Sequence, residues 1–114
     1  MSKYMQLSVK VSSYYPKDFG DAFPELARRL SRLEPSWSEG GPSFFDMVGR
    51  LDQLLYAAEG TELRGVLLRY AEPLRALHRK IEGKIADWRL SEADRYLYEV
   101  EDIFEKIEAD LARA

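Results

Sequence analysis

The chain has a single histidine, His78, the residue type most often used for acid–base chemistry near neutral pH. A di-iron centre in a helical bundle would need a glutamate three residues before each of two histidines. Arg75 occupies that position instead, and the chain has no second histidine. A serine triad would depend on His78 as its only base, but no nucleophile motif accompanies it. We therefore interpret His78 as a residue of a helix surface.

A cluster of carboxylates near the C-terminus suggests a different chemistry. Its members are Glu99, Glu101, Asp102, Glu105 and Glu108. The E-x-x-D step from Glu99 to Asp102 resembles the magnesium-binding helices of the all-α, MazG-like nucleotide pyrophosphohydrolases. The resemblance implies Mg²⁺ held by carboxylates from two helices, which would polarise phosphate and activate water. It also requires an upstream E-x-x-E step. The only one, from Glu59 to Glu62, straddles Gly60, where we expect a helix to end.

Without a second helix of ligands, the acidic cluster is interpreted as a solvated face that complements a basic helix. On this interpretation the chain has no catalytic residue, no cofactor and no metal. Glu99 and Asp102 are kept as the metal ligands of the alternative, a small Mg²⁺-dependent nucleotide hydrolase.

Basic residues raise a third possibility, an accessory subunit that contacts nucleic acid. Arg28, Arg29 and Arg32 lie on one side of a predicted helix and could meet phosphates. However, glutamates interrupt the basic residues of the following long helix, and no nucleic-acid motif accompanies them. The net charge is −3, so the overall field gives no attraction to phosphates. Nucleic acid is therefore not the partner that we expect.

Two long helices, expected over residues 61–89 and 91–113, must position these side chains. The first carries an apolar stripe at steps of three and four residues: Leu63, Leu67, Tyr70, Leu74, Leu77, Ile81, Ile85 and Trp88. The second carries the stripe Ala93, Leu97, Val100, Phe104, Ile107 and Leu111. The short connection predicts antiparallel neighbours, with Ser91 capping the second helix. The first helix is net basic and the second net acidic, which favours the same pairing.

Further helices are expected over residues 23–34 and 43–59. Pro24 suits a first helical turn, and Ser43 can cap the second of these helices. Gly60 in a left-handed conformation would end it, and Thr61 would cap the long helix that follows. Pro73 interrupts that long helix, but the apolar stripe keeps its phase across the proline. We therefore predict one continuous helix with a kink at Pro73.

The N-terminal residues show the strict alternation of a strand. Met5, Leu7, Val9 and Val11 alternate with polar residues, so the pattern predicts a strand over residues 4–11. No second strand is predicted, so its hydrogen-bonding groups need a partner. Trp37 stands in a loop rich in Gly, Pro and Ser, where it either packs back onto the body or waits for a partner. These five residues are the candidate interface.

Composition sets the outer limits. The chain has 114 residues, 46% hydrophobic and 32% charged, which is typical of one globular domain. It has no cysteine, no signal-peptide pattern and no apolar run near the ~20 residues of a membrane span, so we expect a cytoplasmic protein that does not enter a membrane. The prediction is a mainly α antiparallel bundle of about four helices preceded by one β-strand. Its predicted function is a non-enzymatic interaction or oligomerisation module, homodimeric through the strand or paired with an unknown protein.

Overall fold

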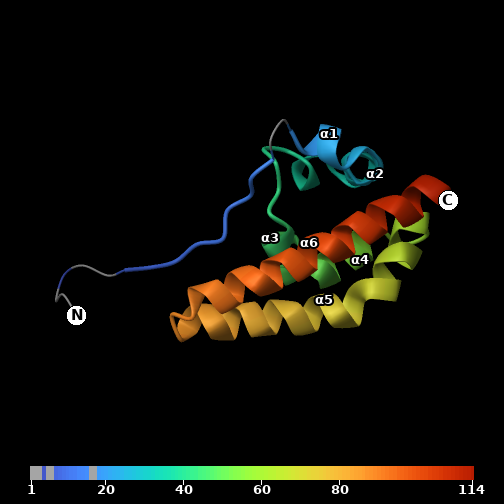
Figure 1. The fold of residues 1–114 in the computed structure, drawn as a ribbon. Helices are drawn as coiled ribbons and strands as arrows, with labels where there is room; N and C mark the ends of the chain where they lie inside the picture. Colours follow the sequence, from blue (N-terminus) through green and yellow to red (C-terminus); the bar gives the residue numbers. More distant parts are fainter. Residues whose placement is uncertain (1–3, 5–6, 16–17) are drawn as a thin grey trace.

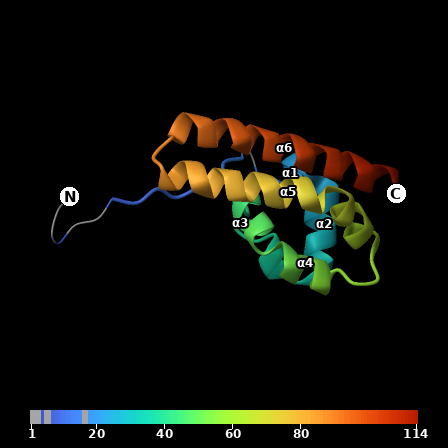
Figure 2. The same cartoon turned by 90° about the horizontal axis from the view of Figure 1, so that it is seen from below.

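The computed structural model describes residues 4, 7–15 and 18–114 and is mainly α, as the sequence predicts. The helices are α1 (Phe19–Ala22), α2 (Pro24–Leu33), the 3-10 turn η1 (Pro35–Trp37), α3 (Phe44–Gly49), α4 (Leu51–Ala57), α5 (Glu62–Ala86) and α6 (Leu90–Arg113). The longest two, α5 and α6, form an antiparallel hairpin (Figure 1). The shorter helices cover one face of it: α2 packs on α6, α3 on both, and α4 on α5 (Figure 2).

The hairpin forms because each of its helices buries the stripe predicted from the sequence. Leu74 and Ile81 of α5, and Phe104 and Ile107 of α6, are at most 1% exposed. Burial of each such side chain contributes about 1.5–3 kcal/mol. Only the end of the predicted α5 stripe departs from the pattern, because Trp88 is exposed.

The signals before α5 were predicted correctly, whereas the helix ends at Ala86 rather than at residue 89. Thr61 caps the helix by accepting a hydrogen bond from the backbone N–H of Arg64, and Gly60 has a φ of 80°. The helix runs unbroken through Pro73 and bends in its N-terminal half (Figure 1), which confirms the continuous helix. The prediction that Ser91 caps α6 is wrong. The helix begins at Leu90, one residue earlier than predicted, and no side chain caps it.

The single helix predicted over residues 43–59 divides at Arg50 into α3 and α4. Ser43 caps α3 as predicted, by accepting from the backbone N–H of Asp46. The division follows Gly49, which lies against His78 of α5. A Cβ placed on Gly49 would lie only 3.1 Å from Nε2 of His78. A tertiary contact therefore accompanies the break, and the local pattern did not indicate it.

The predicted strand is wrong for the part of the chain that the structure describes. Residues 7–15 have no helix or strand assignment, and Met5 lies outside the described residues. Leu7 is 84% exposed, Val9 is 37% exposed and Val11 is half-buried. The physical reason is the one that the sequence raised. A strand needs a second strand to form a ladder, and the described residues of one chain contain none.

Trp37 takes the first of its two predicted alternatives and packs back onto the body. It closes η1, is only 7% exposed and joins the core. The guanidinium of Arg50 lies 4.4 Å from the centre of its ring, a cation–π contact. Trp37 is therefore not an exposed interface residue, and we remove it from the candidate interface.

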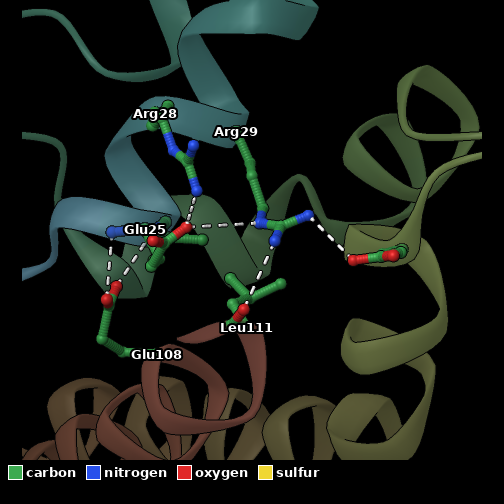
Figure 3. A network of polar contacts seen from close by, with 7 residues as sticks. Glu25, Arg28, Arg29, Glu108 and Leu111 are labelled. Atoms are coloured by element: carbon green, nitrogen blue, oxygen red, sulfur yellow. Dashed lines mark hydrogen bonds and ion pairs between the residues drawn. The ribbon is translucent and has the colours of Figure 1, made fainter. Parts of the chain in front are cut away.

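One carboxylate of the acidic cluster, that of Glu108, links α2 to the hairpin. The side chain of Glu108 on α6 accepts hydrogen bonds from the backbone N–H groups of Glu25 and Leu26 at the start of α2 (Figure 3), at 3.0 and 2.9 Å. No side chain of α2's own N-terminus caps it. Beside this contact, Arg29 reaches the backbone carbonyl of Leu111 and the carboxylate of Glu62 (Figure 3). Glu108 thus supplies from a distant helix the acceptors that a local cap normally provides.

We expect Glu108→Gln to lower the free energy of unfolding by about 1 kcal/mol, because an amide has one acceptor oxygen and no charge. Glu99→Gln makes the same chemical change on an exposed part of α6 and serves as the control. Urea denaturation of both variants is the measurement. Equal stability of the two variants would contradict the capping role.

Candidate functional site

The structure places the two halves of the MazG-like pattern far apart. Glu99 and Asp102 are exposed on α6, whereas Glu62 begins α5 and pairs with Arg29 at 3.3 Å. The contacts of Tyr70 with Asp110 and of Lys84 with Glu92 show which residues of α5 and α6 lie opposite each other. In this register Glu99 lies beside the middle of α5, roughly 25 Å along the helix from Glu62. Among the residues with described positions, no group of three or more His, Cys, Asp or Glu side chains could hold a metal.

Opposite charges on α5 and α6 do meet, as the predicted complementarity requires. Arg69 lies 3.4 Å from Asp110, and Lys84 lies 3.7 Å from Glu92. The phenol of Tyr70 donates to the same Asp110 at 2.7 Å and lowers the pKa of this carboxyl group. Exposed ion pairs contribute little to stability, so the apolar seam remains its main source.

Two of the three arginines proposed for contact with phosphates form ion pairs within the molecule, whereas Arg32 is exposed on α2. Arg28 and Arg29 both pair with Glu25, and Arg29 also pairs with Glu62. His78 is likewise engaged. Its ring stacks on Phe45 with ring centres 4.2 Å apart, and its Nδ1 lies 3.3 Å from Glu82. It is therefore a packing residue between α3 and α5 rather than a histidine of an open helix surface.

An aromatic cleft of about 240 Å³ lies where the N-terminal segment meets α3 and α6. Its walls include the rings of Tyr15, Phe23, Phe44 and Phe45 and the carboxylates of Glu101 and Glu105. The rings of Tyr15, Phe23 and Phe44 belong to one cluster, in which Phe23 lies 4.9 Å from Phe44 and Phe44 stacks on the buried Phe104 at 4.1 Å. The cleft thus has a firm aromatic floor and an acidic edge.

Burial perturbs two ionisable groups in this cleft. Burial and then the carboxylate of Glu101 raise the pKa of Tyr15 from 10.0 to about 12. Burial and then the neighbouring carboxylates Glu105, Asp102 and Asp94 raise the pKa of Glu101. Perturbed groups in a concave site mark a candidate site for binding.

Two side chains attach residues 13–15 to the loop between α2 and α3. The phenol of Tyr15 donates to the backbone carbonyl of Pro42 at 2.6 Å, and the hydroxyl of Ser13 donates to that of Gly41. Beyond this anchor, residues 7–12, which we call the arm, run out from the helices toward the loop end of the hairpin (Figures 1 and 2). The arm is therefore attached at a defined place and directed toward one end of the molecule.

The loop between α5 and α6 contains a tryptophan, Trp88, in a backbone conformation that favours glycine. Trp88 has a φ of 58° and is 56% exposed. The backbone N–H of Trp88 donates to the carbonyl of Ile85, and the backbone N–H of Arg89 donates to the carbonyl of Lys84. These are the two hydrogen bonds of a Schellman motif. The position occupied by Trp88 is the one that glycine usually takes. Leu90, the first residue of α6, is also exposed.

Comparison of the chain with family models, with curated proteins and with solved structures finds no match. Within the described residues, no helix is both long enough and apolar enough to cross a membrane. Inference about function therefore depends on the arm, the hairpin end and the cleft.

Sequence reasoning found the arm but missed the cleft and the role of Trp88. The signal for Trp88 was available, because the residue ends the apolar stripe next to a short loop where a helix needs a left-handed residue. The cleft had no such signal, since Tyr15, Phe44 and Glu101 are distant in the sequence.

Tyr15 makes the stability of the protein sensitive to alkaline pH. Because folding raises its pKa, the neutral phenol stabilises the folded state below pH 10, and this contribution is lost as the pH rises from 10 to about 12. Tyr15→Phe should therefore reduce the fall of the unfolding free energy over this range. Urea denaturation at several pH values is the measurement, and Tyr14→Phe, at the exposed neighbouring side chain, is the control. An unchanged fall in Tyr15→Phe would contradict the assignment.

Proposed function

We propose that this protein is a non-enzymatic interaction module that forms a homodimer through its N-terminal arm. The observation that carries the proposal is the exposed apolar face of the arm, with Leu7 84% and Val9 37% exposed. Exposed apolar side chains on an extended, unpaired segment are typical of a surface that another chain covers.

The backbone of the arm supports the same proposal. Among the described residues, no backbone–backbone hydrogen bond involves residues 7–15, and only the side chains of Ser13 and Tyr15 tie this segment to the α2–α3 loop. The helices cannot pair with the arm, since their own N–H and C=O groups are already bonded within each helix. A strand supplied by another chain would satisfy both the backbone and the alternating side chains.

A second copy of the same chain is the simplest source of that strand. Antiparallel pairing about a two-fold axis is self-complementary and closed. If the axis passes through Ser8, Leu7 faces Val9 of the second copy, and Lys10 faces Gln6 rather than another Lys10. This register joins apolar residues and avoids opposing like charges.

Two paired strands are only marginally stable alone, so the pair needs an apolar surface beneath it. The loop end of the hairpin offers one, because Trp88 and Leu90 are exposed there and the arm runs toward this end (Figure 1). We propose that the arm and the hairpin end together form the dimer interface. The left-handed Trp88 fits this role, since a strained residue with an exposed aromatic side chain suggests a function other than stability.

Adjacent positions of the alternating pattern provide a matched test of the dimer. Leu7→Asp places a charge on the apolar face and should convert the protein to a monomer at tens of micromolar, on the order of ordinary dimer affinities. Gln6→Asp adds the same charge on the polar face, opposite Lys10 of the second copy in this register, and should leave the dimer largely intact. Sedimentation equilibrium measures both, and circular dichroism checks that the helices remain.

Three outcomes would contradict the homodimer. The intact protein could be monomeric, in which case strand addition by a different protein takes its place. The two aspartate variants could dissociate equally, which would rule out the alternating face. Alternatively, Leu7→Asp could leave the dimer intact, which would place the interface elsewhere.

Trp88→Gly should change stability and association in opposite directions. A residue other than glycine in the left-handed region costs ~1–2 kcal/mol, so glycine should raise the free energy of unfolding by about 1 kcal/mol while weakening the dimer. Trp88→Ala removes the same ring but keeps the strain, so it should weaken the dimer without the gain. Stability is measured in the Leu7→Asp background, where dissociation does not contribute. A dimer unaffected by both substitutions would remove Trp88 from the interface.

A further inference from the structure

The aromatic cleft has a charge that nothing in the described part of the chain neutralises. Glu101 and Glu105 line it, and no lysine or arginine does. Neither carboxylate forms an ion pair with any described residue, although other acidic residues of α6, such as Glu92, Glu108 and Asp110, have cationic or N–H partners. The acidic edge of the cleft is thus short of positive charge.

The other walls of the cleft are suited to apolar groups and to cations. Tyr15 lies edge-on to Phe44 with ring centres 6.0 Å apart, and Phe23 lies edge-on to Phe44 at 4.9 Å. The hydrogen bond from Tyr15 to Pro42 keeps its ring in this position. Aromatic faces attract cations through their quadrupole, and they also bury alkyl groups.

From this combination we propose that the cleft binds a small aliphatic amine in its ammonium form. The ammonium group lies at the acidic edge beside Glu101 and Glu105, and the alkyl chain lies on the rings of Tyr15, Phe23 and Phe44. The volume of about 240 Å³ suits a ligand of a few heavy atoms rather than a nucleotide.

The lining disfavours other classes of ligand. An anion would meet two carboxylates without a cation to offset them. A bare divalent metal ion needs more oxygen ligands than the two carboxylates here, and the described residues hold no group of three His, Cys, Asp or Glu. A neutral apolar molecule would offer the two carboxylates no positive charge. Burial and like charges already raise the pKa of Glu101, and a bound cation would relieve this penalty.

The test is an NMR titration of the full chain with n-butylammonium chloride at pH 8 and constant ionic strength, with 1-butanol as the neutral probe of similar shape. We expect saturable shifts in the methyl signals of Val11, Leu97 and Val100, which line the cleft, with a dissociation constant on the order of 1–10 mM. Glu101→Gln should weaken binding about tenfold. Glu99→Gln, which removes the same charge from an exposed part of α6, should change it less than about twofold.

Each opposite result would overturn the proposal. Butanol that binds as tightly as butylammonium would mean that the cleft selects only apolar groups. Equal weakening by both glutamine variants would mean a general effect of charge, and the absence of saturable shifts would mean no site. The titration is repeated with Leu7→Asp, whose altered side chain does not line the cleft. Unchanged binding in that variant separates amine binding from dimer formation.

Discussion

The apolar seam between α5 and α6 is the contact on which the rest of this molecule depends. Leu74, Ile81, Phe104 and Ile107 are almost entirely removed from water along it. Each described shorter helix contacts the hairpin or a neighbour that lies on it. The ion pairs across the seam add little to its strength, since exposed pairs contribute little. The short helices α3 and α4 bury one face each and depend on this surface.

Proposed binding features lie at the margins of that seam. The arm departs beside the hairpin, Trp88 lies at the hairpin's loop, and the cleft opens where α6 passes the root of the arm. This division is common in small domains, because the packed interior tolerates few polar groups and leaves recognition to the segments around it. The rigid hairpin therefore acts as the frame that places the arm and the cleft on one molecule.

Periodicity and capping chemistry were sufficient to predict the hairpin, the continuous helix through Pro73 and the caps at Ser43 and Thr61. These features depend on residues within a turn or two of each other. The break at Arg50 was not predictable in this way, because it accompanies a close approach of Gly49 to His78 on another helix. The burial of Trp37 and the cleft around Tyr15 also arise from residues distant in the sequence. The alternating pattern of the arm was real, but an alternating pattern specifies a face and cannot supply the missing neighbour.

The cap that Glu108 provides for α2 has a consequence for how the chain acquires its structure during synthesis. The carboxylate of Glu108 accepts hydrogen bonds from two backbone N–H groups, which lie 83 and 82 positions earlier in the sequence. A nascent chain that has emerged only as far as α5 contains α2 but lacks the carboxylate that satisfies its first turn. The beginning of α2 therefore reaches its final bonding only after almost the whole sequence has left the ribosome. A contact of such long sequence separation ties the completion of the N-terminal half to the arrival of the last helix.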